Sequence, residues 1–272
     1  MKKDMKMRVF NLSMVLLTFF IIYLPIFVVM LLSFHGTRLS FESYDFTLKW
    51  YRGILDSPYL MRAIGVTLQV AVLSTLLSTI LGTLFAIGIH SMKKKTRLRM
   101  MILNNIPVVN PDIITGIMLY IVFFFLRSAL GVPMFGFQTM LIAHVFFSIP
   151  FVVLSVLPKL KSLDANIFDA ALDLGATKFK AVLLVIIPSI KVGILAGALI
   201  AFTMSIDDFI ISYFVSGTTQ NVSIYAYSML ARRDFPMEVF AYNTLIVVIT
   251  IGIMITFSYS NRKDKKVKGE KK

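Results

Sequence analysis

The feature that most constrains this chain is a series of apolar runs, each long enough to cross a lipid bilayer. The first, residues 10–34, contains no charged side chain. A cleaved signal peptide has an apolar region of only about 7–15 residues, so we expect this run to remain as a membrane helix. Five more runs follow, at residues 63–89, 101–126, 138–157, 185–214 and 239–257. The predicted fold class is an all-α membrane protein with six transmembrane helices.

Composition and charge support this class. The chain is 57% hydrophobic and 15% charged, with a mean hydropathy of +0.82, which is too apolar for one water-soluble core. Lys and Arg number 20 on one side of the predicted membrane and 7 on the other. Cytoplasmic connections carry the excess of Lys and Arg, so both termini are predicted to lie in the cytoplasm and the protein in the cell membrane. This distribution explains the net charge of +14 without nucleic acid.

The predicted boundaries are a cytoplasmic N-terminus at 1–9, a six-helix domain at 10–260 and a basic cytoplasmic tail at 261–272. The absence of cysteine excludes disulfides and thiolate metal sites. The connection 33–62 contains the only tryptophan, Trp50, and we interpret it as an amphipathic segment with Trp50 anchored among lipid headgroups.

The third apolar run contains a helix-start signal at membrane depth. Pro107 is followed by Asn110-Pro111-Asp112, a sequence typical of a helix N-terminus. We therefore predict a broken or kinked helix at this point. Broken helices within a membrane are tolerated where they line a cavity or are covered by protein, so the location is informative.

The segment 164–188 is a long polar interruption on the cytoplasmic side. Asp164 is a suitable N-cap for a helix over residues 165–174, and Gly175 stands where a left-handed glycine would end it. Thr177 is a suitable cap for a second helix, which Pro188 would bend about three turns later. Two short helices joined at a glycine form a lever on which a separate protein could act.

This segment resembles the conserved loop of the membrane subunits of binding-protein-dependent ABC importers. Asp169-Ala170-Ala171, then Gly175, then Val185-x-Ile187-Pro188 match the pattern Glu-Ala-Ala, Gly, Ile-x-Leu-Pro, with Asp169 and Ile187 as conservative departures. The resemblance implies the type I importer permease fold, in which the coupling loop (here 159–188) fits a groove of an ATPase homodimer. The alternative is an ordinary amphipathic helix at the membrane surface, since alanine and glycine are common.

The sequence contains no nucleotide-binding or catalytic motif in addition to this loop. The chain lacks the GxxxxGK[ST] phosphate loop, so ATP and Mg would be bound by the partner ATPase, and no cofactor or metal site is expected in this chain. It also lacks HExxH and comparable nucleophile sets, which predicts a non-enzymatic subunit. The three histidines, His35, His90 and His144, are scattered, and we interpret them as loop or packing residues.

Carboxylates inside the predicted spans are the direct indication of a solute pathway. Asp112, Asp207 and Asp208 fall there, and intramembrane charges are by default functional. We place Asp112 near the midplane, about 16 Å into its span. On a continuous helix Asp208 shares a small, polar face with Ser205, whereas Asp207 does not, so Asp208 is the preferred pathway residue. Tyr213 and the carboxylates suit an organic cation. The alternatives are that Asp112 lies in the first turn of a helix restarted at Pro111, and that Asp207 and Asp208 are caps at the outer membrane interface.

Three further segments, 45–51, 110–113 and 205–217, resemble the second permease subunit of spermidine/putrescine importers. That resemblance implies a heterodimer with a related permease, an external polyamine-binding protein and import by alternating access. Two alternatives remain open. A permease for another solute, such as ferric ion, thiamine or an amino acid derivative, would keep the loop without depending on Asp207 or Asp208. A stand-alone channel or membrane enzyme would need no ATPase.

Overall fold

The computed structural model describes residues 2–36, 45–131, 135–164, 166–232 and 237–252. The predicted helical class is confirmed, because the only strand-like pairing in these ranges is a single bridge between His35 and Phe46. The chain divides into two compact units, residues 1–61 with 228–272 and residues 62–227. The predicted basic tail, 261–272, lies outside the described residues.

The first unit contains α1 (Lys2–Leu32), α2 (Lys49–Asp56) and a helix over Met237–Gly252. It also includes the first residues of α3 (Pro58–Ser91) and the last of α12 (Val222–Ala231). The apolar part of α1, Phe10–Leu32, buries none of its residues within the chain. A helix that is apolar on every side and exposed within its own chain is suited to contact with lipid or another membrane subunit.

Trp50 lies inside the first unit, so its predicted role as a membrane-surface anchor is wrong. Its side chain is only 6% exposed, and its indole Nε1–H donates to the carbonyl of His35 at 2.6 Å. Lys49 Nζ stands 5.3 Å from the centre of the Trp50 ring. The indole thus fixes the start of α2 to the chain that follows α1, and pairing the N–H removes the cost of burying it.

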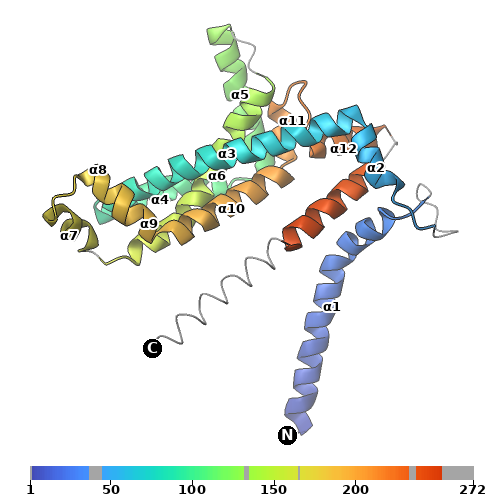
Figure 1. Ribbon diagram of the computed structural model, residues 1–272, viewed down its shortest axis with the longest axis horizontal. Coiled ribbons are helices and arrows are strands. Elements are labelled where there is room, and N and C mark those ends of the chain that lie inside the picture. The colour runs from blue at the N-terminus through green and yellow to red at the C-terminus, as the bar shows by residue number, and fades with distance from the viewer. Residues whose placement is uncertain (1, 37–44, 132–134, 165, 233–236, 253–272) are drawn as a thin grey trace. The chain divides into compact units, whose positions relative to one another are not determined.

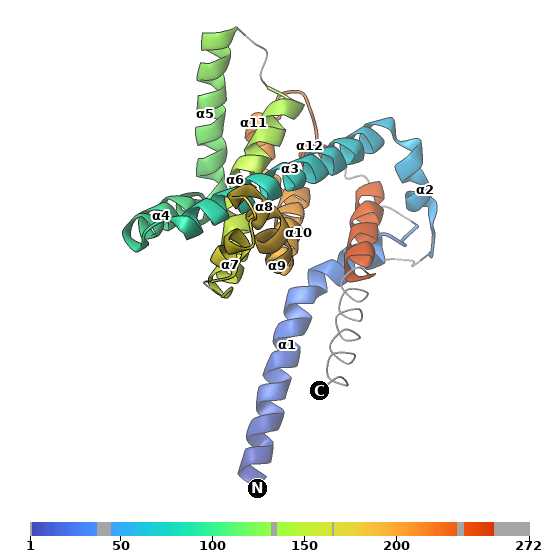
Figure 2. The same ribbon diagram turned by 60° about the vertical axis from the view of Figure 1, so that its left-hand side comes forward.

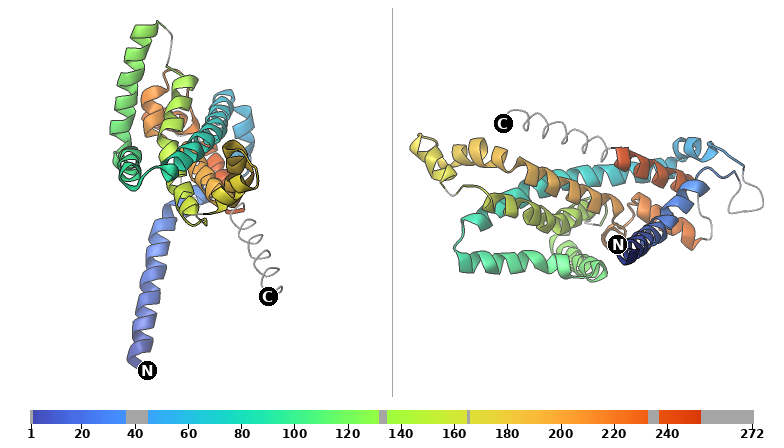
Figure 3. Two further views of the ribbon diagram at one scale, coloured as in Figure 1. Left: turned by 90° about the vertical axis from the view of Figure 1, so that its left-hand side faces the viewer. Right: turned by 90° about the horizontal axis from the view of Figure 1, so that it is seen from below.

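The second unit is built around α6 (Phe137–Lys161), which has the largest buried share among the four candidate spans. Against it pack α4 (Lys94–Val109), α10 (Lys191–Asp207) and α11 (Ile210–Val215), while α5 (Asp112–Leu130) packs on α11. In Figure 1 and Figure 3, α3, α6 and α10 run alongside one another. The short elements α7 (Ile167–Asp173), α8 (Lys178–Ala181), the π-helical turn η1 (Val182–Ile186) and α9 (Ile187–Ser189) lie at one end of these helices.

Small residues allow α3 and α10 to approach α6 closely. A Cβ at Gly82 of α3 would stand 2.7 Å from the side chain of Val152, and one at Gly197 of α10 would stand 3.1 Å from the Val152 backbone. Val152 belongs to an apolar cluster that joins the three helices, and its other members include Ala86, Ile89, Val153, Val156, Leu157, Leu160, Ile186 and Ile190. Close packing of this kind holds helices together in lipid, where apolar side chains gain little by leaving the solvent.

The number of spans is smaller in the described residues than the six predicted. Four helices are long and apolar enough to cross a membrane, and a fifth results if the bent pair Lys178–Ser189 and Lys191–Asp207 counts as one span. The predicted sixth span, 239–257, corresponds to the shorter helix Met237–Gly252, and its last residues lie outside the described ranges. The all-helical membrane class is therefore confirmed, whereas the count of six is not.

The predicted break in the third span is confirmed, but its consequence for Asp112 is not. The chain leaves α4 at Asn110 and starts α5 at Asp112, and the two helices meet at a corner in Figure 2. The apolar span is Asp112–Ala129, without the basic helix α4. Asp112 is consequently the exposed first residue of α5, where a carboxylate favours the helix dipole. The depth of Asp112 in the membrane stays a prediction.

Close packing at Gly82 gives a direct test of the α3–α6 contact. Gly82→Ala should lower the melting temperature of the detergent-solubilised protein, because overpacking costs about 1–3 kcal/mol. Gly88, six residues further along α3, has no described atom within 4 Å of an added Cβ. Gly88→Ala should leave the melting temperature unchanged or raise it, since alanine is the better helix former. Equal changes in melting temperature for the two substitutions would contradict this close contact between α3 and α6.

Candidate functional site

The two-helix lever predicted at residues 164–188 is present. Helix α7 ends at Asp173, and Gly175 follows with φ +85°, in the left-handed region that glycine adopts without strain. Gly175 N–H donates to the carbonyl of Leu172 at 2.9 Å, and Ala176 N–H donates to that of Ala171 at 3.1 Å. This pair of bonds is a Schellman motif, which satisfies carbonyls that the helix end would otherwise leave free.

The second half of the lever follows the predicted signals as well. Thr177 caps α8, with its Oγ1 accepting from Lys180 N–H at 3.3 Å. The chain then continues without interruption through η1 and α9, and bends by 73° before α10. Pro188 lies in α9, next to this bend, and a proline in a continuous helix removes one backbone hydrogen bond and favours a kink. The lever is thus continuous with the long helix α10.

One detail of the N-terminus differs from the prediction. Helix α7 begins at Ile167, not at residue 165, and Asp164 Oδ1 accepts from Asn166 N–H at 2.9 Å. Asp164 therefore closes the turn that precedes the helix. Residue 165 lies outside the described ranges.

The exposed surface of the lever is partly apolar. Asp169, Ala170, Gly175 and Pro188 are exposed, and Ala171 is buried. Sequence reasoning missed two large side chains on either side of the glycine, Leu174 and Phe179, which are 90% and 72% exposed. Exposed apolar side chains beside a glycine elbow are typical of a surface that a partner protein covers. Their signal in the sequence was weak, because apolar residues are expected throughout a membrane chain.

A second site lies where α10 gives way to α11. Asp208 has an extended backbone, φ −66° and ψ 126°, so the helix stops after Asp207. The Asp208 carboxylate accepts from the N–H groups of Ile211 at 3.3 Å and Ser212 at 2.7 Å, and thereby caps the start of α11. The Asp208 carbonyl accepts from Asn221 Nδ2 at 3.0 Å, and Asn221 Oδ1 accepts from Ile224 N–H in α12 at 2.9 Å.

His144 of α6 joins the two sides of this break. Its Nδ1 stands 2.6 Å from Ser205 Oγ, in the last turn of α10, and its Nε2 stands 2.9 Å from Ser212 Oγ, in the first turn of α11. Nε2 is also 3.4 Å from Asp208 Oδ2. Ser74 of α3 donates to Ser205 at 3.1 Å. His144 is 1% exposed, and the two serines that it contacts are buried.

The break reverses the arrangement of the two aspartates that the sequence predicts. A continuous helix would have presented Asp208 to a pathway and turned Asp207 away, but the helix is interrupted between them. The side chains of Asp208 and Ser205 are hydrogen-bonded inside the second unit. The side chain of Asp207 is exposed and makes no hydrogen bond or ion pair with any other residue that the structure describes. The roles of Asp112, Asp207, Asp208, Ser205 and Tyr213 in a pathway remain predictions.

Three aromatic rings gather beside the break. Phe209 lies between the two aspartates and α11, and its ring centre is 5.6 Å from that of Tyr213 and 4.9 Å from that of Tyr227. The two tyrosine rings are 5.7 Å apart and stand edge to face. Tyr213 is 49% exposed and Tyr227 is 47% exposed. Tyr227 was not predicted, because it comes from a separate helix, α12. Exposed aromatic faces next to a free carboxylate can hold a cation.

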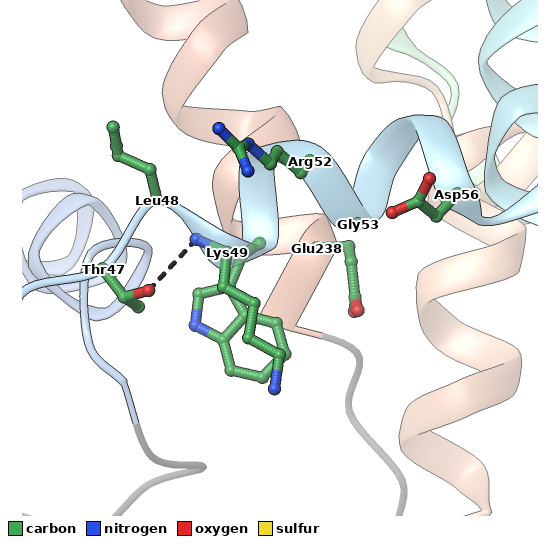
Figure 4. Close-up of a pocket in the computed structure, with 8 residues that line it drawn as sticks. Thr47, Leu48, Lys49, Arg52, Gly53, Asp56 and Glu238 are labelled. Atoms are coloured by element: carbon green, nitrogen blue, oxygen red, sulfur yellow. Dashed lines mark hydrogen bonds between the residues drawn. The ribbon is translucent and has the colours of Figure 1, made fainter.

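The first unit contains a pocket of about 530 Å³ along α2 (Figure 4). Its polar lining includes Lys49, Arg52, Asp56 and Glu238, and a Cβ at Gly53 would stand 3.0 Å from Glu238 Cγ. In Figure 4, Lys49 and Glu238 extend to the same side of α2, and Arg52 extends to the other. The charges are of both signs and mostly exposed, so the pocket does not select one class of ligand. Within the described ranges, no three His, Asp or Glu side chains could together hold a metal ion.

Comparison with known proteins identifies the family. Residues 78–269 match the binding-protein-dependent transport system inner membrane component, and this stretch includes both the lever and the helix break. The chain belongs to this family. It is a multi-pass membrane component of a transport system of the ABC importer type, and the predicted permease fold is confirmed.

Individual relatives extend the match to the rest of the chain. The chain is 31% identical over 245 residues to the spermidine/putrescine transport system permease protein PotC of Escherichia coli (strain K12), with 90% of each protein covered. It is 34% identical over 206 residues to the putrescine transport system permease protein PotI of the same organism, covering 74% of this chain and 73% of that protein. A solved bacterial ABC transporter for the polysaccharide alginate shares the fold, with a TM-score of 0.72, 18% identity, and 96% and 98% of the two chains covered.

The two neighbouring aspartates should differ in their effect on stability. Asp208→Ala removes the cap of α11 and leaves buried N–H groups unpaired, which costs about 1–3 kcal/mol. Asp207→Ala removes an exposed carboxylate that has no partner among the described residues. We therefore expect only Asp208→Ala to lower the melting temperature in detergent. Asp208→Asn keeps an acceptor at the same place and should recover part of the loss. If Asp207→Ala lowered the melting temperature more than Asp208→Ala, the Asp208 carboxylate would not be the group that stabilises the break.

Proposed function

We propose that this chain is a permease subunit of an ATP-driven ABC importer that carries polyamines such as spermidine and putrescine across the cell membrane. The observation that carries the proposal is the similarity to PotC over 90% of both chains, supported by the similarity to PotI. Both relatives are named for polyamine transport. The family supplies the transport role, and these relatives suggest the substrate class.

The helix break supplies a physical reason for this substrate class. A polyamine carries ammonium groups separated by apolar methylene segments. Asp207 offers an exposed carboxylate for an ammonium group, and the rings of Phe209, Tyr213 and Tyr227 offer π faces for cations and apolar surface for methylenes. An exposed carboxylate at membrane depth is costly unless it faces a polar cavity or a cationic solute. In this proposal Asp207 and Tyr213 line the pathway, Asp208 and Ser205 shape the break, and Asp112 lies at the start of α5.

The lever supplies the means of coupling to ATP. We infer that Asp169, Ala170, Ala171, Gly175 and Pro188 belong to a docking element for an ABC ATPase homodimer, with Leu174 and Phe179 as its apolar contacts. ATP and Mg²⁺ are bound by that partner, and this chain performs no catalysis. Closure of the ATPase dimer would push the lever and, through the continuous chain, α10. The cavity would then open outward, and hydrolysis would return it inward.

The remaining partners follow from the same role. A second, homologous permease subunit would complete a heterodimer, and an extracytoplasmic polyamine-binding protein would deliver the solute. One solved alginate transporter is described in complex with a solute-bound periplasmic protein, and it shares the fold of this chain at a TM-score of 0.66. In this proposal both termini, residues 1–9 and 261–272, lie in the cytoplasm, which agrees with the excess of Lys and Arg on that side. The bilayer surrounds the complex, and nucleic acid has no part in it.

Substitution of Asp207 tests the substrate. In cells that express the complete importer, uptake of labelled spermidine and putrescine is measured against concentration. Asp207→Asn should raise the KM about tenfold or more, because a charge-assisted contact is worth about 1.5–3 kcal/mol. Thr203→Ala, on the exposed side of α10 one turn earlier, is the matched control and should leave the KM unchanged. Uptake that does not depend on Asp207 would direct the search to another solute, such as ferric ion, thiamine or an amino acid derivative.

Substitution of Gly175 tests the coupling. Gly175→Val forces a β-branched residue into the left-handed region, so the elbow should change shape. We expect the variant to remain in the membrane but to lose uptake and copurification with the ATPase. Gly175→Asn is the control, since asparagine tolerates this conformation, and it should retain most of the uptake. Normal copurification of the Gly175→Val variant with the ATPase would contradict the docking role. Transport by the chain in the absence of any ATPase would identify it as a channel.

A further inference from the structure

His144 is the buried polar side chain that the proposed pathway and lever leave without a role. It is fully enclosed in the second unit and comes from α6, the helix against which α4, α10 and α11 pack. A buried imidazole in an apolar helix is costly unless both ring nitrogens are paired. Both are paired here, and their partners lie on opposite sides of the same helix break.

The hydrogen bonds around His144 form a consistent chain. Ser74 donates to Ser205, so the Ser205 hydroxyl can give its own proton to His144 Nδ1. Nε2 is then the ring donor, directed to Ser212 at 2.9 Å and to Asp208 at 3.4 Å. Ser205 belongs to α10, whereas Ser212 belongs to α11. The His144 ring of α6 therefore connects α10 and α11, between which the helical backbone hydrogen bonds are interrupted at Asp208.

Helix α10 runs from the lever to the helix break, so the His144 connection lies at the far end of α10 from the lever. α10 has 17 residues and begins directly after the lever, at the 73° bend. At 1.5 Å per residue it extends about 25 Å from the lever to the break. A displacement of its first turn must therefore reach Asp207 at its other end. Beyond that residue the helix is interrupted, and the backbone alone does not force α11 to follow.

We propose that His144 is a positioning residue that makes α6, α10 and α11 move as one body, so that movement of the lever reaches the carboxylate and the aromatic rings at the break. This inference rests on the proposed function and names the residue that transmits the movement. Without the ring bonds, α10 slides at the break while α11 stays with α5, on which it packs. ATP hydrolysis then continues, but less solute is carried for each ATP.

The test uses the complete importer reconstituted in proteoliposomes. The measured quantity is the ratio of polyamine imported to ATP hydrolysed. His144→Phe keeps an aromatic ring and removes both nitrogens, and the ratio should fall about tenfold, which corresponds to the loss of one or two buried hydrogen bonds. The ATPase rate and the amount of assembled complex should remain within about twofold of the unsubstituted protein. His144→Asn keeps an acceptor near Nδ1 and His144→Gln keeps a donor near Nε2, so each should recover part of the ratio.

A matched control lies on the same helix. Ser148 is buried one turn beyond His144, and its hydroxyl has no hydrogen-bond partner among the described residues. Ser148→Ala should leave the ratio unchanged. A normal ratio in His144→Phe would overturn the proposal. A parallel fall of ATPase rate and assembled complex, with an unchanged ratio, would also overturn it, because His144 would then serve stability alone.

A second measurement separates this inference from the choice of substrate. The chain contains no cysteine, so Ile210→Cys at the start of α11 is a single reporter. Its rate of reaction with a maleimide should differ between the nucleotide-free and the ATP-bound importer, and His144→Phe should abolish that difference. No polyamine is required. An importer that carries no polyamine would refute the proposed function and leave this readout valid, whereas a nucleotide response that survives His144→Phe would refute the role of His144.

Discussion

The second unit depends on the pairing of backbone groups where the apolar helix α10 stops. Lipid offers no hydrogen bonds, so a break between α10 and α11 leaves N–H and C=O groups that the protein itself must satisfy. The Asp208 carboxylate satisfies the N–H groups of Ile211 and Ser212, and Asn221 satisfies the Asp208 carbonyl. His144 then joins the hydroxyls on both sides. The break is therefore a stable feature of the fold.

Asp208 has a structural use that its neighbour Asp207 does not share. A carboxylate that accepts two backbone bonds and faces an imidazole has little capacity left for a passing cation. The Asp207 side chain has none of these contacts among the described residues and is exposed. Asp208 thus stabilises the irregular backbone, and in the proposed function Asp207 presents its charge to the solute. Asp207 is exposed, whereas Asp208, with its extended backbone, is half-buried.

Features set by neighbouring residues could be predicted from the sequence, and features set by distant partners could not. The Gly175 elbow, the Thr177 cap and the break before Asp112 each depend on signals within a few positions. The interior position of Asp208 depends instead on His144, 64 residues earlier in the sequence, and on Asn221. The segment 205–212 contains neither glycine nor proline, and its two aspartates also fit a continuous helix, so the sequence near Asp208 does not predict the end of α10. Trp50 was misplaced for the same reason, since its partner is the carbonyl of His35.

The glycines at the α6 contacts show how the lever and the break are joined. Gly193 and Gly197 let α10 approach α6 closely: an added Cβ would stand 2.7 Å from the Lys159 side chain at Gly193 and 3.1 Å from the Val152 backbone at Gly197. Contacts of this kind resist sliding along the helix axis but do not hold the chain beyond the end of α10. Hydrogen bonds at the break supply that constraint, because they are directional and because a buried polar group that loses its partner is costly. Apolar packing near the lever and polar pairing near the break are thus complementary, and α6 provides the partner for both.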